Sequence, residues 1–291
     1  MKIQDILSET RTISFEFFPP REASGIPAVL GKIESLKSYS PNFISVTYGA
    51  GGSTRQFTEE LTIKSKTDYD MEVMAHLTCV GHTVKELDEV LERLEFSSIE
   101  NVIALRGDPP HDQTKFLAAE GGFKHASDLI RHISEHYSFG IGAACYPEGH
   151  PEAVSLDYDL RYAKLKVDNG AKFLVTQLFY DNDDFFHFVD RARDIGIEVP
   201  IIPGVLPVLS SKQIRRFTRL CGASIPADLE AHLVKYENDD ESARAMGVEY
   251  ATYQVQALWD AGVSGIHFYV LNRSYSVSNI LDNLQLDRHT S

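Results

Sequence analysis

Eight short runs of apolar and β-branched residues recur along the chain, and stretches with helical periodicity separate most of them. Each run is nearly continuous in hydrophobic residues, which is typical of parallel strands buried on both faces. The runs are TISFEFFP (12–19), FISVTYG (43–49), EVMAHLTC (72–79), NVIALRGD (101–108), FGIGAACYP (139–147), KFLVTQLFY (172–180), VPIIPGVLP (199–207) and GIHFYVLN (265–272). Eight strand–helix units within 291 residues predict an α/β protein with a (β/α)8 barrel, the TIM-barrel architecture.

Helical patterns occupy the segments between these runs, and several of them end in Gly just before the next strand. They cover 26–39, 83–96, 125–137, 156–170 and 182–196, and the segment 211–262 is long enough for extra helices before the last strand. No linker-like stretch interrupts the pattern, so we expect one catalytic domain over residues 1–291. A doubly wound open sheet is the alternative. It is less favoured because no GxGxxG follows the first run and YGAGGS (48–53) is only a weak glycine cluster.

The charge balance limits the partners of such a protein. The chain has 28 Lys and Arg against 42 Asp and Glu, a net charge of −14, which disfavours nucleic acid and anionic membrane surfaces. Cys79, Cys145 and Cys221 are widely spaced, which points to a reducing compartment rather than to disulfides or a zinc ribbon. With neither a signal peptide nor a membrane-spanning run, we expect a cytoplasmic protein.

Polar residues gather near the ends of the predicted strands, although the strand bodies are apolar. In a (β/α)8 barrel the chemistry lies at the carboxyl ends of the strands. This rim would carry Glu16, Thr47, His76, Thr78, Asp108, Tyr146, His150, Gln177, Asn272 and Arg273.

Glu16 is the strongest candidate for catalysis because it interrupts an aromatic strand. Strand alternation places Ser14, Glu16 and Phe18 on one face, opposite Ile13, Phe15 and Phe17. If Glu16 points into the barrel, burial should raise its pKa, as suits a general acid near neutral pH. The alternatives are a salt bridge to Lys or Arg inside the barrel and an edge position facing water.

Two further segments carry polar side chains suited to ligands. ALRGDPP places Arg106 and Asp108 after the fourth strand, with Gly107 allowing close approach of a ligand to the backbone. Asp108 could stabilise a cation, or it could simply pair with Arg106. CYPEGHPEA offers Tyr146 for stacking and His150 for hydrogen bonding, although a rigid turn explains the segment equally well.

A metal site or a nucleophilic active site is not expected. His76 and Cys79 are three residues apart in a strand, so their side chains should lie on opposite faces. His76, His150 and His267 come from separate strands and would converge only by chance of the fold. No GxSxG elbow or activated Cys is present.

Taken together, these segments resemble the catalytic domain of methylenetetrahydrofolate reductase. The resemblance rests on SFEFFPPR, FISVTYGAGGS, AHLTC, ALRGDPP, YPEGHPEA, KVDNGAKFLVTQLFYD, IIPGVLPV and HFYVLNRS, in this order over nearly the whole chain. It implies a (β/α)8 barrel that binds FAD at the strand carboxyl ends. It also implies reduction of 5,10-methylenetetrahydrofolate to 5-methyltetrahydrofolate with NADH or NADPH, the two substrates taking turns at one flavin face.

The resemblance also assigns roles by position. Glu16 matches the general acid, and Asp108 matches the carboxylate that stabilises the iminium cation of the folate. The positions that hold folate or the nicotinamide correspond to Gln177, Gln213, Phe217 and Arg273. The flavin contacts correspond to Thr47, His76, Arg106, Gly107, Asp108, Ala126, Tyr146, His150, Ala153, Asp159 and Lys166.

The chain departs from many bacterial members at three positions near the flavin. Tyr162 and Leu165 replace an Asn and an Arg directed at the flavin phosphates, and His125 replaces a Tyr. Two alternatives therefore stay open: a reductase that works without a tightly held flavin, and a folate- or flavin-binding subunit of a larger complex. Because the chain ends soon after the barrel, we expect no inhibition by adenosylmethionine. The resemblance implies a homo-oligomer or a partner subunit, and it leaves NADH and NADPH undistinguished.

Overall fold

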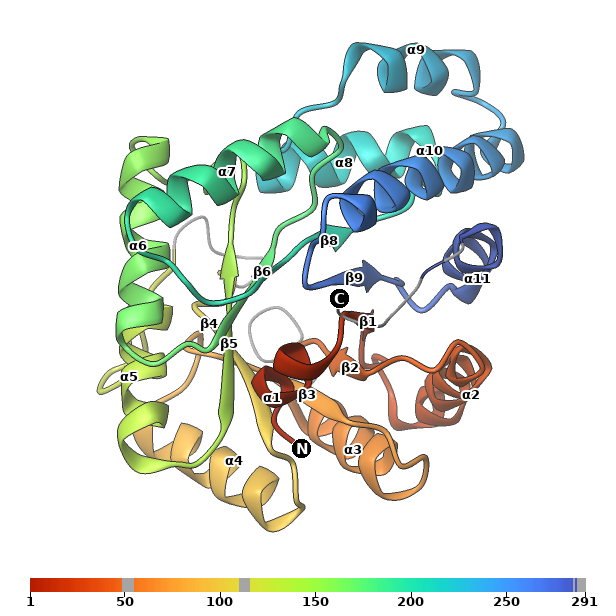
Figure 1. The fold of residues 1–291 in the computed structure, drawn as a ribbon. Helices are drawn as coiled ribbons and strands as arrows, with labels where there is room; N and C mark the ends of the chain where they lie inside the picture. Colours follow the sequence, from red (N-terminus) through yellow and green to blue (C-terminus); the bar gives the residue numbers. More distant parts are fainter. Residues whose placement is uncertain (49–54, 110–115, 285, 287–291) are drawn as a thin grey trace.

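A parallel barrel ringed by helices forms the molecule (Figure 1), seen here in a computed structural model. The structure describes residues 1–48, 55–109, 116–284 and 286. From Gly49 onward, the weak glycine cluster at 48–53 lies outside the described residues.

All eight predicted runs form strands, and every pairing between neighbouring strands is parallel. The strands are β1 (Thr12–Phe17), β2 (Phe43–Val46), β3 (Val73–Thr78), β4 (Asn101–Leu105), β5 (Gly140–Cys145), β6 (Phe173–Thr176), β7 (Ile201–Ile202), β8 (Gly204–Val205) and β9 (Gly265–Tyr269). Their order in the sheet is β7-β6-β5-β4-β3-β2-β1-β9-β8. The predicted (β/α)8 barrel is therefore confirmed.

The seventh run forms two short strands because Pro203 interrupts it. Proline has no N–H to donate to a neighbouring strand, so the ladder changes partner at this residue. Before the proline, β7 pairs with β6, and after it β8 pairs with β9. The carbonyl of Pro203 accepts from the His267 N–H at 3.0 Å, while the Gly204 N–H donates to the Thr176 hydroxyl at 2.9 Å. This single segment therefore joins the two ends of the sheet and closes the barrel.

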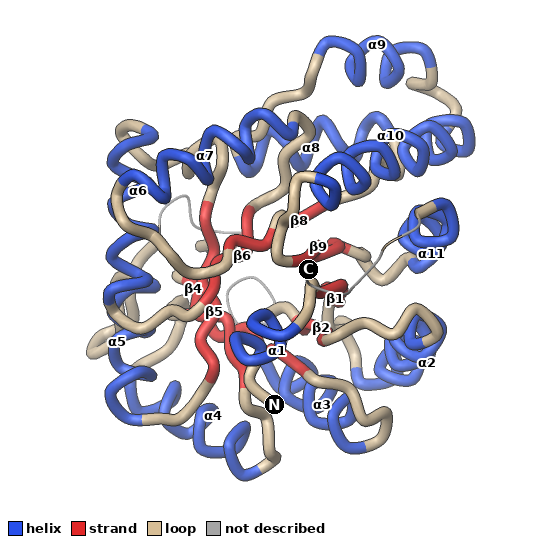
Figure 2. Tube along the Cα trace, viewed as in Figure 1, coloured by secondary structure: helices blue, strands red, loops and turns tan. Residues whose placement is uncertain are grey.

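The helices surround the strands on the outside of the barrel, except for the first, which lies across one end of it (Figure 2). They are α1 (Ile3–Glu9), α2 (Ile26–Lys37), α3 (Arg55–Thr67), α4 (Val84–Phe96), α5 (Ala126–His136), α6 (Leu156–Asp168), α7 (Asn182–Asp194), α8 (Ser211–Cys221), α9 (Ala227–Lys235), α10 (Asp240–Asp260) and α11 (Ser274–Asn283), with a 3-10 turn η1 (Ala23–Gly25). Three of them, α8, α9 and α10, fill the segment for which extra helices were predicted. No helix among the described residues combines the length and the apolar character that a bilayer crossing requires.

Two apolar cores hold the barrel together. Ile13, Phe15 and Phe17 of β1 are fully buried in the larger core, between the strands and the helices. A smaller core fills the amino-terminal end of the barrel interior, where Phe43 and Phe173 pack with α1. The α1 helix contributes Ile3 and Leu7 to this core. Its Ile3 N–H donates to the Asn101 side chain at 2.8 Å, so α1 covers the end of the barrel opposite to the strand carboxyl ends.

Candidate active site

A cavity of about 700 Å³ opens at the carboxyl ends of the strands. Glu16 and Asp108 line this cavity, as do Gln177 and Phe217. All the positions that the resemblance assigns to the flavin line it too: Thr47, His76, Arg106, Gly107, Asp108, Ala126, Tyr146, His150, Ala153, Asp159 and Lys166. Gln213 and Arg273 are not among the lining residues. The structure thus brings most of the predicted residues to one place.

Glu16 points into the barrel, as strand alternation predicted. The residue is 8% exposed. The Oε2 atom lies 3.2 Å from Nε2 of His76 and 3.6 Å from Nε2 of His267. The Ser45 hydroxyl donates to the same oxygen at 3.5 Å. Glu16 therefore pairs with two imidazoles. It does not form the alternative salt bridge to Lys or Arg, and it does not lie at an edge facing water.

The expected rise in the pKa of Glu16 was wrong. Burial raises the pKa of this carboxyl, but a hydrogen bond from His267 and the charge of His76 outweigh burial and lower the pKa to about 2. The prediction failed because it considered only the aromatic neighbours within the strand. The two histidines come from β3 and β9, which are distant in sequence from β1.

His267 contacts Glu16 but was not among the site residues predicted from the sequence. Its register partner on β1 is Ser14, whose hydroxyl lies 2.8 Å from Nδ1 of His267. Nε2 of the same ring lies 3.3 Å from the Ser45 hydroxyl, and Phe43 stacks on the ring at 6.0 Å between centroids. A histidine within the apolar run GIHFYVLN was the available signal, because a buried imidazole needs polar partners. The expectation that these histidines would not converge was wrong for His76 and His267.

The segment after β4 presents backbone and charge to the cavity. Gly107 has φ +83°, and a Cβ there would lie 2.6 Å from the Val80 side chain, so only glycine fits. Arg106 forms a two-point ion pair with Glu152, at 2.6 and 2.9 Å. The Arg106–Asp108 pair considered from the sequence is therefore replaced by Arg106–Glu152. Asp108 is exposed at the cavity rim and remains available to a ligand.

The loop after β5 forms a wall of the cavity. Tyr146 and His150 meet edge to face, with ring centroids 4.8 Å apart. The His150 Nδ1 accepts the Glu152 N–H at 3.1 Å, which fixes the ring. Burial lowers the pKa of His150 and raises that of Tyr146, so both groups favour their neutral forms. A neutral imidazole and phenol can each donate and accept hydrogen bonds, as a polar heterocyclic ligand requires.

A half-buried cation and a half-buried carboxylate lie beyond this loop, on α6. The Lys166 ammonium donates to the Ala144 carbonyl at 2.8 Å. Burial lowers the pKa of Lys166, although Asp159 opposes this shift. Burial likewise raises the pKa of Asp159, against the charge of Lys166. Lys166 therefore places a positive charge at this end of the cavity, and the Asp159 carboxylate partly compensates it.

Two of the three positions that depart from bacterial members, His125 and Tyr162, form an aromatic cluster with Tyr158 at the same end. Tyr158 and Tyr162 of α6 lie with ring centroids 5.1 Å apart and hydroxyls 3.1 Å apart. His125 lies 6.1 Å from the Tyr162 ring, and all three side chains line the cavity. Leu165 is 41% exposed and is not a lining residue. Of the two positions noted on this helix, Tyr162 therefore adds aromatic surface to the cavity and Leu165 does not.

A strained turn after β9 forms the opposite rim. Leu271 and Asn272 have φ of +52° and +56°, which residues other than glycine seldom adopt. The Asn272 side chain holds the turn by accepting the Phe18 N–H at 2.9 Å and donating to the Phe18 carbonyl at 2.8 Å. The turn places Leu271 against the cavity and leaves Arg273 exposed outside its lining.

The fold and the cavity define a (β/α)8-barrel protein with a candidate ligand site at the strand carboxyl ends. The family model described as Methylenetetrahydrofolate reductase matches residues 2–285, and the chain belongs to this family.

The chain is 41% identical to Methylenetetrahydrofolate reductase (NADH) 1 of Arabidopsis thaliana, over 98% of this chain and 50% of the plant protein. It is 38% identical to 5,10-methylenetetrahydrofolate reductase of Escherichia coli, over 92% and 90% of the two chains. The chain thus spans about half the length of its plant relatives. A similar fold occurs in a Clostridium thermocellum protein that binds two copies of 5-methyl-5,6,7,8-tetrahydrofolic acid, with TM-score 0.61, 15% identity and 97% coverage of both chains.

Proposed function

We propose that this protein reduces 5,10-methylenetetrahydrofolate to 5-methyltetrahydrofolate, with FAD as the hydride carrier and NADH or NADPH as the reductant. The observation that carries the proposal is the place of Glu16. It is a buried carboxylate held against two imidazoles in the cavity that all the predicted flavin positions line. Family membership gives independent support, since relatives named for this reaction match nearly the whole chain.

The cavity has the polar groups that a flavin ring would need. Thr47 Oγ1 is buried and has no hydrogen-bond partner among the described residues. Thr47 lines the cavity, and buried polar atoms are normally paired. A flavin ring would supply a partner for this hydroxyl and could lie against the Gly107 backbone. When bound, FAD would supply the capacity to accept a hydride from the nicotinamide and pass it to the folate.

The far end of the cavity suits the dinucleotide half of FAD. Lys166 and the first turn of α5, at Ala126, would neutralise the diphosphate, because helix amino termini favour anions. Tyr158 and Tyr162 would contact the adenine. Stacking on these rings would take over part of the binding that Asn and Arg provide in bacterial relatives.

Glu16 and its histidines would control the proton that opens the folate ring. The methylene bridge becomes an electrophilic iminium only when a proton reaches the amine that leaves it. Before substrate binds, Glu16 is a carboxylate, and two imidazole nitrogens lie within 3.6 Å of Oε2. A proton passed from an imidazole through Glu16 would reach the substrate amine, so the acid would be the three-residue cluster of Glu16, His76 and His267.

Other residues of the cavity would orient the substrates. Asp108, at the rim, would stabilise the iminium cation once ligands exclude water from it. Gln177 and Phe217 line the cavity and would hold the pterin or the nicotinamide by hydrogen bonding and stacking. Gln213 and Arg273 lie outside the lining, so we place them at the mouth, against the outer part of the folate.

Anaerobic half-reactions on the purified protein test the proposal. We expect bound flavin with its visible absorption, loss of that absorption on adding NADH or NADPH, and its return on adding methylenetetrahydrofolate. Turnover without any flavin would favour the flavin-independent reductase, to which Tyr162 and Leu165 give some weight. Flavin or folate binding without either half-reaction would favour the binding-subunit alternative. Either result would contradict the proposed mechanism.

A further inference from the structure

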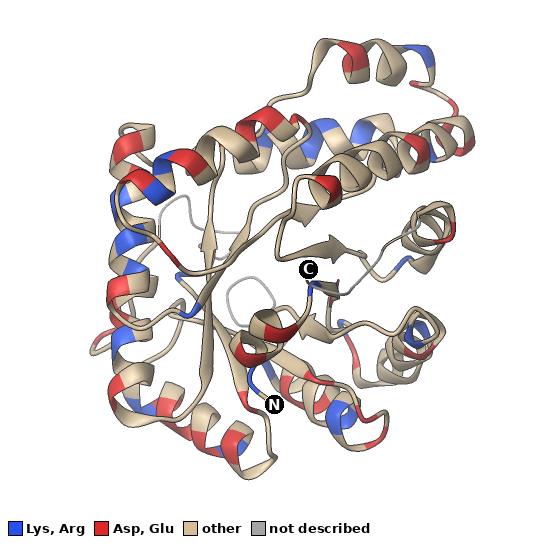
Figure 3. Ribbon diagram, viewed as in Figure 1, with Lys and Arg blue, Asp and Glu red and all other residues tan. Residues whose placement is uncertain are grey.

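Few acidic or basic side chains face the candidate active site. The surrounding helices carry most of the charge, and in the strands that the structure describes Glu16 is the only Asp, Glu, Lys or Arg (Figure 3). Four carboxylates and two cations line the cavity: Glu16, Asp108, Glu152, Asp159, Arg106 and Lys166. A ligand that fills the cavity excludes water, so these charges act on it through a medium that screens them weakly. The resemblance assigns a role to each of the six except Glu152.

Glu152 holds the guanidinium of Arg106 at the cavity wall. The Arg106 Nη1 donates to Oε2 of Glu152 at 2.6 Å, and Nη2 donates to Oε1 at 2.9 Å. The Arg106 guanidinium also lies over the Phe116 ring, 5.2 Å from its centroid. The Arg106 side chain is 24% exposed and that of Glu152 is 59% exposed. The cation is therefore the more buried partner, and two-point pairing fixes its orientation.

The charge of Arg106 acts on other groups that line the cavity. Burial is the main cause of the lowered pKa of His150; the charge of Arg106 lowers this pKa further, and that of Glu152 opposes the decrease. Burial is likewise the main cause of the lowered pKa of Lys166, and Arg106 again adds to it. The field of Arg106 thus extends to the loop after β5 and to α6, and Glu152 reduces it.

A flavin ring in this cavity would respond to the balance between these two charges. Hydride transfer from a nicotinamide adds two electrons and one proton to the ring, and the negative charge collects at N1 and its neighbouring carbonyl. The same two electrons later leave as hydride to the methylene carbon of the folate iminium. A cation near the ring stabilises the reduced form and raises the reduction potential, whereas a carboxylate lowers it.

We propose that Glu152 is a positioning residue that sets the reduction potential of the bound flavin by pairing with Arg106. This inference rests on the proposed function, because it requires a flavin in the cavity. The carboxylate offsets the positive field of Arg106 on the reduced ring and so lowers the potential. Reduced flavin then gives up its hydride to the folate more readily, and reduction by the nicotinamide is favoured less.

Redox titration of the flavin-loaded protein against a dye of known potential tests the proposal. Glu152→Gln keeps the shape and can still accept a hydrogen bond from Arg106, but it removes the charge. The equilibrium should shift about 5-fold towards reduced flavin, which is about 20 mV to more positive potential for two electrons. Glu152→Asp keeps the charge and should retain the wild-type potential. Arg106→Gln should shift the potential in the negative direction.

The two half-reactions supply a readout that a structural defect would not reproduce. In Glu152→Gln, reduction of the flavin by NADH should become faster and its oxidation by methylenetetrahydrofolate slower, because the driving force changes with opposite sign in the two steps. Anaerobic stopped-flow absorbance measures both rates. A cavity damaged by the substitution would slow both half-reactions, and that result would overturn the proposal.

A matched control variant separates Glu152 from the net charge of the protein. Glu60→Gln removes the same charge from the Lys64–Glu60 pair on α3, at 2.7 Å, and Glu60 is not a lining residue. This control should leave the potential unchanged. An equal shift in Glu60→Gln and Glu152→Gln would mean that net charge acts, and would overturn the proposal.

The other results that would overturn the proposal concern Glu152 and Arg106 themselves. One is a wild-type potential in Glu152→Gln, and another is an equal shift in Glu152→Asp, which would assign the effect to packing. If Glu152→Gln does not retain flavin, a wild-type potential in Arg106→Gln would overturn it. Failure of the wild-type protein to bind flavin, or to have it reduced by NADH or NADPH, would instead contradict the proposed function.

Discussion

Glu16 combines burial with two histidine partners, and its behaviour depends on both. Burial alone would keep the carboxyl protonated, but His267 and His76 lower its pKa to about 2. The carboxylate is therefore stable in the free protein, with two imidazole nitrogens within 3.6 Å of one oxygen. Proton donation then depends on how these three groups share a proton when a basic amine enters the cavity.

Replacing Glu16 by Gln should separate the two half-reactions. Gln has nearly the same shape but cannot transfer the proton, so folate reduction should fall by about 100-fold or more. Flavin binding and reduction by the nicotinamide should persist, because neither step needs that proton. Stopped-flow absorbance of the flavin measures both half-reactions. Equal loss in both would instead indicate a damaged cavity.

The same substitution should change the response of the protein to acid. The folded-state pKa of Glu16 is about 2, below its ordinary value of 4.5. Its stabilising contribution is therefore fully present above pH 4.5 and is lost as the pH falls towards 2. The free energy of unfolding should fall more steeply with acid in the wild-type protein than in Glu16→Gln. Urea unfolding at several pH values between 5 and 3 measures this difference, and parallel curves would contradict the pKa assignment.

Helix α6 shows how the cavity-lining side chains of one element can differ between relatives while the fold stays the same. It places Asp159 and Lys166 at the cavity, as the resemblance implied, while Tyr158 and Tyr162 provide aromatic surface in the same turns. Only Tyr162 was noted from the sequence. Tyr158 could not be identified, because its role depends on lying 5.1 Å from Tyr162 across one helical turn at the cavity.

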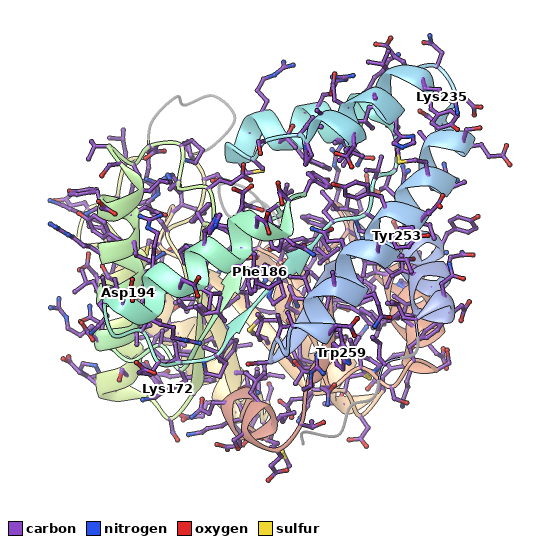
Figure 4. All side chains as sticks on the ribbon, turned by 45° about the horizontal axis from the view of Figure 1, so that its top comes forward. Lys172, Phe186, Asp194, Lys235, Tyr253 and Trp259 are labelled. Atoms are coloured by element: carbon purple, nitrogen blue, oxygen red, sulfur yellow. The ribbon has the colours of Figure 1, made fainter. Side chains whose placement is uncertain are left out.

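Removing both rings should weaken FAD binding specifically. The double variant Tyr158→Ala and Tyr162→Ala should bind FAD about 10-fold less tightly, because a stacked base contributes roughly 1–3 kcal/mol. Binding of FMN, which lacks the adenine, should change little. Fluorescence titration with both flavins measures the effect. Tyr253→Ala serves as a control, since Tyr253 is 70% exposed on α10 (Figure 4). Equal weakening for FMN would place the adenine elsewhere.

At the scale of the whole molecule, the barrel could be predicted because each strand run is apolar and the helices have their own periodicity. The residues at the strand ends were predictable for the same reason, since a parallel barrel brings those ends together. The pairing of Glu16 with His76 and His267 was not predictable, because it joins β1, β3 and β9 across the interior. The partner change at Pro203 and the exposed position of Arg273 also depend on the closed barrel rather than on local sequence.

The position of the short helix α1 bears on the order in which the two substrates of the proposed reaction would bind. Ile3 and Leu7 pack with Phe43 and Phe173 and fill the amino-terminal end of the barrel interior, so among the described residues the cavity opens at the strand carboxyl ends. With a flavin bound, the nicotinamide and the folate would both need its exposed face and would both reach it through the same cavity mouth. Under the proposed function, the first would have to leave before the second binds. The apolar core at the amino-terminal end of the barrel, remote from any reacting atom, would thereby make the two substrates bind one after the other.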